Sequence, residues 1–142
     1  MRLFLMTATA AFFPLASLMM TTEALAVQDT PTTINGVETV CTGVGSAKDD
    51  PRWSAYPVKV VLATAGGANL ADAHVTVSKA GQPVVQTDCD APWILIKAPP
   101  GDYSVTASLI GGSGQSPSAD FSGGGGAQKE ITLTFLRPPA SN

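Results

Sequence analysis

Ala91–Leu109 reads APWILIKAPPGDYSVTASL, and its pattern decides the fold class. Trp93–Lys97 is an almost uniformly apolar run of strand-forming residues, which is typical of a central strand. Pro99-Pro100-Gly101 ends this run with fixed φ angles followed by a permissive residue. From Asp102 to Leu109, apolar and hydroxyl side chains alternate, as in an antiparallel strand with one face in water. The stretch therefore predicts two strands joined by a tight turn.

Strand patterns with a period of two recur on both sides of this stretch. Further strands are predicted into Cys41 and over 57–64, 74–79, 83–87 and 129–136, with a weaker edge strand over 115–121. Ala80-Gly81-Gln82 is expected to turn the chain in a hairpin. Turn signals come about every 8–12 residues and no long stretch has a helical period, so we predict an all-β fold. The expected architecture is an antiparallel β-sandwich of about seven strands in two sheets.

The start of the chain has the pattern of an export signal. Arg2 precedes a long apolar stretch, and Ala24 and Ala26 supply the small residues that a signal peptidase recognises. An uncleaved membrane anchor is the alternative, which Pro14 and the small residues disfavour. The predicted divisions are a signal peptide (1–26), a flexible leader (27–35), one sandwich domain (36–136) and a C-terminal tail (137–142). We therefore expect a periplasmic or secreted protein that meets the membrane only through its signal peptide before cleavage.

Charge is low and scattered along the chain. The formal net charge is −3, and the eight Lys and Arg residues form no cluster. Binding a polyanion requires clustered basic side chains that displace its counterions. The sequence therefore predicts no nucleic-acid partner.

Cys41 and Cys89 are the two cysteines of the chain. An even number of cysteines in an exported protein indicates a disulfide. A redox pair normally has the spacing Cys-x-x-Cys, and a metal site needs further His or Cys ligands. Closing a loop of about fifty residues should stabilise the fold by about 4 kcal/mol.

The motif G-x-Y-x-V-x-A after the Pro-Gly turn of APWILIKAPPGDYSVTASL resembles the carboxypeptidase regulatory-like, or prealbumin-like, sandwich family. The pieces CTGVG, DPRWSAYPVKV and LADAHVTVS also resemble small exported proteins of Gram-negative bacteria with this fold. The resemblance covers about 36–135. It implies a prealbumin-like sandwich with an accessory, carbohydrate-binding, adhesive or stabilising role, and it implies no reaction. Tyr103 of the motif is expected to bury its ring while its hydroxyl finds a backbone partner.

Residues that commonly carry chemistry are few. His74, the one histidine, is predicted on the outward face of a strand without a Ser or Cys nucleophile at readable spacing, so we expect it to be exposed. Paired acidic residues leave open a calcium site or paired carboxylates for hydrolysis; they are Asp49, Asp50, Asp88 and Asp90. No calcium-loop motif is present, and Asp50 is better explained as a cap or partner for Arg52. We predict no enzyme activity, no metal and no cofactor.

Three aromatic residues form the predicted ligand-binding site: Trp53, Tyr56 and Trp93. Such rings can stack on a sugar, and two of them lie in or beside the loop from Cys41 to Tyr56. The alternative, which the sequence favours, is that Trp53 and Trp93 serve packing. We predict an exported, non-enzymatic accessory or interaction module whose partner is a protein or an envelope glycan, bound by this loop or by an edge strand. The alternative function is a carbohydrate-binding module of the cell envelope that uses the three aromatic residues.

Overall fold

The two strands predicted around the Pro-Gly turn lie in different sheets. The computed structural model describes residues 28–112 and 114–136, so the predicted signal peptide and C-terminal tail lie outside the described residues. β6 (Trp93–Lys97) is the middle strand of a five-stranded sheet, and β7 (Gly101–Leu109) is an inner strand of a four-stranded sheet. The turn at Pro99-Pro100 thus carries the chain from one sheet to the other. The predicted central position of β6 is confirmed.

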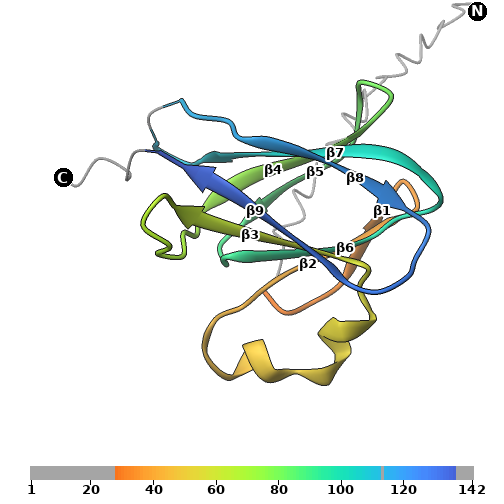
Figure 1. The fold of residues 1–142 in the computed structure, drawn as a ribbon, viewed down its shortest axis with the longest axis horizontal. Coiled ribbons are helices and arrows are strands. Elements are labelled where there is room, and N and C mark those ends of the chain that lie inside the picture. The colour runs from red at the N-terminus through yellow and green to blue at the C-terminus, as the bar shows by residue number, and fades with distance from the viewer. Residues whose placement is uncertain (1–27, 113, 137–142) are drawn as a thin grey trace, which may run out of the picture.

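The sheets face each other as two layers (Figure 1). The five-stranded sheet has the order β1 (Thr32–Ile34), β2 (Val37–Thr42), β6, β3 (Val58–Thr64) and β9 (Lys129–Phe135). The four-stranded sheet has the order β5 (Gln82–Cys89), β4 (Ala73–Lys79), β7 and β8 (Ser118–Gly123). Two short 3-10 helices, η1 (Gly45–Asp49) and η2 (Pro51–Ala55), follow β2. The predicted all-β fold of two sheets is confirmed.

Alternation along the strands builds the core between the sheets. In β7, Tyr103, Val105 and Ala107 are buried, whereas the hydroxyl residues between them face outward. The neighbouring strand β4 contributes Val75 and Val77 to the core. The facing strands β3 and β9 contribute buried residues of the same kind: Val58, Val60, Leu62, Leu133 and Phe135. Burying a side chain of Val or Leu size stabilises a fold by about 1.5–3 kcal/mol. This apolar layer therefore fixes which face of each sheet meets water.

The folded part of the chain begins earlier than the sequence analysis predicted. β1 lies inside the predicted flexible leader, 27–35, and pairs with β2 through a two-residue turn at Asn35-Gly36. Both turn residues have positive φ, at 50° and 78°, as a type I′ hairpin turn requires. The Asn35 side-chain amide also donates a hydrogen bond to the Val84 carbonyl oxygen, at 2.7 Å. With β1 included, the described residues form nine strands rather than about seven.

The prediction of purely antiparallel sheets is wrong at one position. β9 runs parallel to β3, with Val58 opposite Lys129 and Thr64 opposite Phe135. Only strands joined by a short hairpin must be antiparallel, and the chain visits the other sheet before it returns as β9. The direction of β9 therefore depends on this return path, which the strand pattern does not contain.

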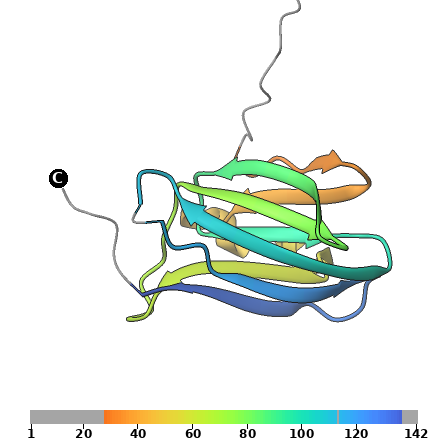
Figure 2. The ribbon, with the colours of Figure 1, turned by 90° about the horizontal axis from the view of Figure 1, so that it is seen from above.

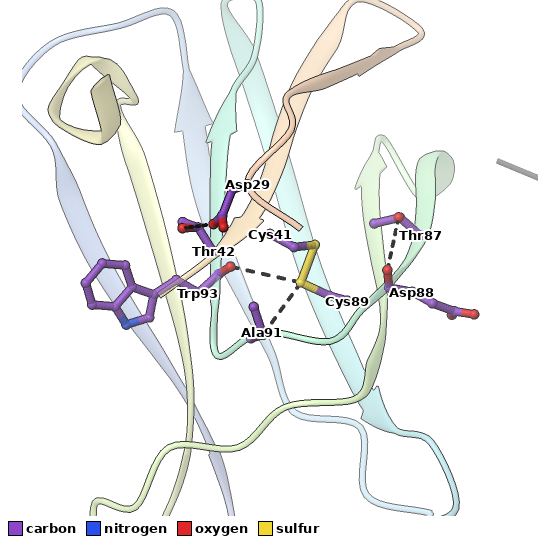
Figure 3. Close-up of a disulfide and its surroundings, with 8 residues drawn as sticks. All are labelled: Asp29, Cys41, Thr42, Thr87, Asp88, Cys89, Ala91 and Trp93. Carbon is purple, nitrogen blue, oxygen red and sulfur yellow. Dashed lines mark hydrogen bonds between the residues drawn. A yellow bond between two sulfur atoms is a disulfide. The ribbon is translucent and has the colours of Figure 1, made fainter. Parts of the chain in front are cut away.

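Cys41 and Cys89 form the predicted disulfide, with Cα atoms 5.7 Å apart (Figure 3). Cys41 belongs to β2 and Cys89 to β5, so the bridge joins one sheet to the other. Both cysteines are buried.

Among the described residues, no helix is long and apolar enough to span a membrane.

Candidate ligand-binding surfaces

The loop after β2 covers the outer side of the five-stranded sheet. Figure 2, in which the four-stranded sheet faces the viewer, shows η1 and η2 behind both sheets. Trp53 and Tyr56 form a second buried cluster with Val40 and Leu95, two outward-facing residues of this sheet. The Trp53 indole N–H donates a hydrogen bond to the Ala47 carbonyl oxygen, at 2.7 Å, which ties η2 to η1. Trp53 therefore packs the loop onto the sandwich, as the favoured reading of the sequence predicted.

Tyr56 is held by hydrogen bonds at its side-chain hydroxyl and at its backbone carbonyl oxygen. Its hydroxyl donates a hydrogen bond to a Glu38 carboxylate oxygen, at 2.6 Å, and burial together with this bond raises the pKa of Tyr56. The Gln128 amide donates hydrogen bonds to the carbonyl oxygens of Trp53 and Tyr56, at 2.8 and 3.1 Å. Because Trp53 and Tyr56 are only 4% and 5% exposed, neither ring offers a face on which a sugar could stack.

Trp93 is the predicted aromatic residue that stays partly exposed. Figure 3 shows its indole pointing away from the disulfide. The ring contacts the Gly43 backbone, where a Cβ atom would lie 2.7 Å from two ring carbons. The Lys59 ammonium lies 3.6 Å from a ring centroid and also pairs with Glu130, at 3.3 Å. The loop and this cation thus already occupy much of the ring, and the structure does not bring the three predicted aromatics together as one exposed platform.

Asp50 has the role that the sequence favoured for it. Its carboxylate accepts a hydrogen bond from the Arg52 backbone N–H, at 2.9 Å, and so caps the start of η2. It also accepts three further hydrogen bonds from the Arg52 guanidinium, at 2.7, 2.9 and 3.1 Å. These hydrogen bonds lower the pKa of Asp50. Asp50 is therefore a structural cap for this loop.

His74 and Asp88 lie side by side on the outer face of the four-stranded sheet. The pairing of β4 with β5 places them opposite each other, and the His74 Nδ1 atom is 2.6 Å from an Asp88 carboxylate oxygen. The predicted exposure of His74 is confirmed. Within residues 28–112 and 114–136, no group of three or more His, Cys, Asp or Glu side chains is placed to hold a metal ion. Asp49, Asp50, Asp88 and Asp90 therefore belong to no such group within the described residues.

A groove of about 520 Å³ lies at one end of the four-stranded sheet, and the sequence analysis did not identify it. Its lining comes from the end of β4, from the β4–β5 turn, from β7 and β8, and from the first residue of β9. The polar lining residues are Ser78, Asp102, Ser104, Asp120, Ser122 and Lys129. All but Lys129 lie at the outward positions of their strands, because the residues that alternate with them face the core. The sequence signal was the run of Ser and Asp at alternate positions of β7 and β8, which taken alone predicts only a wet strand face.

Rigid elements support this groove. Below it, the rings of Tyr103 and Phe121 stack at 5.3 Å with planes 10° apart, and both residues are buried. The Tyr103 hydroxyl donates a hydrogen bond to the Pro99 carbonyl oxygen, at 3.0 Å, so its predicted backbone partner is confirmed. At the rim, Ala80 and Gly81 form a two-residue turn with φ angles of 51° and 77°. The lining side chains are thus held on strands and a tight turn.

The polar side chains that line the groove form no ion pair or side-chain hydrogen bond with other described residues. Among the described residues, the carboxylates of Asp102 and Asp120 and the ammonium of Lys129 form no ion pair, in contrast to Asp50, Asp88 and Glu130. The hydroxyls of the three lining serines form no side-chain hydrogen bond within the same residues. These groups are free to bind a ligand.

No family model matches the chain, and no curated protein matches it.

Proposed function

We propose that the protein is an exported, non-enzymatic binding module, an accessory β-sandwich of the carboxypeptidase regulatory-like type that recognises a component of the cell envelope. The observation that carries the proposal is the groove on the four-stranded sheet, whose polar side chains have no partners within the described chain. Exposed polar side chains without a protein partner bond to water, and a ligand can replace that water. Six such side chains on one concave surface favour a binding site.

Export is supported by the disulfide and by the signal-like start of the chain. Disulfides form and persist in oxidising compartments such as the periplasm and the extracellular space. The Cys41–Cys89 bridge is buried between the sheets, where it serves stability rather than redox exchange. We therefore place the protein in the periplasm or outside the cell.

The chemistry of the groove supports binding rather than catalysis. A Ser nucleophile requires a base within hydrogen-bonding reach, commonly a His. The groove is lined by Ser, Asp, Tyr, Phe, Lys, Ala and Gly, and His74 is not among the lining residues. The hydroxyls and carboxylates of the groove can orient a ligand through hydrogen bonds without any covalent bond being broken.

Retention of the purified, oxidised protein on envelope extract tests the proposal. Ser122→Arg places a long cationic side chain in the groove, and Gln86→Arg places the same side chain on β5 of the same sheet, outside the groove lining. Both positions are exposed, so both variants should fold with the same change in charge. We expect retention to be lost in Ser122→Arg and kept in Gln86→Arg. Equal retention of the two variants would show that the groove is not the binding surface.

A further inference from the structure

We infer that the groove binds a short neutral saccharide chain, an inference that rests on the proposed binding function. The relevant groups are the hydroxyls of Ser78, Ser104 and Ser122 and the carboxylates of Asp102 and Asp120. A serine hydroxyl can donate one hydrogen bond and accept others, and an ionised carboxylate accepts several. A sugar presents adjacent hydroxyls that also donate and accept. The groove therefore offers a saccharide more complementary partners than it offers a ligand with one kind of polar group.

The arrangement on the sheet suits such a ligand. Ser78, Ser104 and Asp120 form one row across β4, β7 and β8, because Ser78 pairs with Ser104 and Ser104 pairs with Asp120. Asp102 and Ser122 pair in the next outward row. Neighbouring strands are about 4.8 Å apart. The two rows thus present regularly spaced hydrogen-bonding groups along a concave strip, rather than a single charged point.

Other ligand classes match the groove less well. An anionic ligand would meet two carboxylates and one ammonium, so the local charge repels it. An apolar ligand needs exposed apolar surface, but Tyr103 and Phe121 are only 5% and 4% exposed. A divalent cation needs more than two carboxylates at this open position. A cationic peptide is the closest competitor, and the Lys129 ammonium in the lining repels it.

The rigid surroundings reduce the cost of binding. The stacked rings beneath the groove and the Ala80-Gly81 turn at its rim hold the lining residues in place before a ligand arrives. Preorganisation of this kind reduces the conformational entropy that is lost on association. Serine side chains add little to that loss, because they have few rotamers to restrict.

Amide NMR spectra recorded during titration with defined probes test the inference. The probes are maltotriose, the trisaccharide of N-acetylglucosamine, and trilysine. We expect at least one trisaccharide to shift amides of β7 and β8 around the groove, with an affinity that does not change between low salt and 0.5 M NaCl, since a neutral ligand is not screened (~10 Å Debye length at 0.1 M). Trilysine should give no such shifts.

Matched variants assign the site. Asp120→Asn removes one carboxylate from the groove, and the affinity for the saccharide should fall about ten-fold because a charge-assisted hydrogen bond is lost. Asp90→Asn makes the same chemical change at an exposed position beyond the far end of β5, and it should leave the affinity unchanged. Equal effects of the two variants, or shifts that map to the loop 43–56, would overturn the inference.

The outcomes also separate this inference from the proposed function. If neither trisaccharide shifts the groove amides, or trilysine alone does so in a salt-sensitive manner, the saccharide inference is wrong. The binding function then still stands if Ser122→Arg abolishes envelope retention and Gln86→Arg does not. If Ser122→Arg has no effect on retention, the proposed function itself fails.

Discussion

Single residues decide how closely the parts of this sandwich approach each other. Gly43 is buried against the Trp93 indole with a φ of 102°, a backbone conformation that residues with a side chain rarely adopt. Tyr56 has a polar group inside a buried cluster and satisfies it with Glu38. Both residues belong to the loop that covers the five-stranded sheet, so changes at either should affect stability before they affect any ligand.

We predict that Gly43→Ala destabilises the fold by about 2 kcal/mol, because the added Cβ would both strain the backbone and press on the Trp93 ring. Gly45→Ala is the matched control: φ is 60°, but a Cβ there would meet nothing within 4 Å. Urea unfolding of the two variants measures the difference. If Gly45→Ala is as damaging as Gly43→Ala, the contact with Trp93 does not contribute.

Because of Tyr56, we predict that the free energy of unfolding depends on pH in the alkaline range. Its pKa is raised by burial and by the hydrogen bond to Glu38, whereas the unfolded side chain titrates near the ordinary value of about 10. Above that pH the unfolded state loses its proton first, so the free energy of unfolding falls as pH rises. Tyr56→Phe should weaken this fall while lowering stability at pH 8 by about 1 kcal/mol. Urea unfolding at pH 8 and pH 11 tests the prediction, and parallel losses in both proteins would contradict it.

At the scale of elements, two hairpin turns of the same length show how turn chemistry sets local stability. The β1–β2 turn uses Asn35-Gly36 and the β4–β5 turn uses Ala80-Gly81, and all four residues have positive φ. Asn and Gly tolerate this conformation, whereas Ala has a Cβ atom that opposes it. Ala80 therefore holds a strained conformation at the rim of the groove.

We predict that Ala80→Asn stabilises the protein by about 1 kcal/mol, because Asn is the preferred first residue of such a turn. Ala65→Asn provides a control at an exposed position without positive φ, where a change within about 0.5 kcal/mol is expected. Thermal unfolding of both variants provides the comparison. A lower melting temperature for Ala80→Asn would show that the alanine serves another contact.

At the scale of the whole molecule, the disulfide and the chain path hold the two sheets together. Cys41 and Cys89 close a loop with a sequence separation of 48 and connect β2 with β5, at the side of the sandwich away from β8 and β9. On the other side, the Gln128 amide ties the β8–β9 connection to the loop after β2. The bridge should therefore matter for overall stability more than for any single surface.

We predict that replacing both cysteines by alanine lowers the free energy of unfolding by about 4 kcal/mol, because the unfolded chain regains the entropy of the open loop. Reduction of the unchanged protein should lower it by a similar amount. Urea unfolding of the oxidised, reduced and doubly substituted proteins measures these values. A loss below about 1 kcal/mol in both cases would show that burial between the sheets, and not the covalent bridge, holds this side of the sandwich.

Much of the fold could be predicted because its signals are local. Alternation in Asp102–Leu109 and in the run from Val58 revealed buried and wet faces, since successive side chains of a strand point in opposite directions. The start of the chain could have been predicted better, because the Asn35-Gly36 pair between two extended runs is itself a hairpin signal. The all-β class, the disulfide partners and the packing role of Trp53 thus followed from the sequence by itself.

Only the tertiary structure decided the direction of β9, the pairing of His74 with Asp88 and the groove. Each depends on strands that are distant in the chain and become neighbours through the order of the sheets. Ser78, Ser104 and Asp120 look like ordinary wet positions when their strands are considered singly, and they form a row only because β7 lies between β4 and β8. The alternation of side chains along a strand determines the face of the sheet on which each one lies. The order of the strands determines its neighbours on that face.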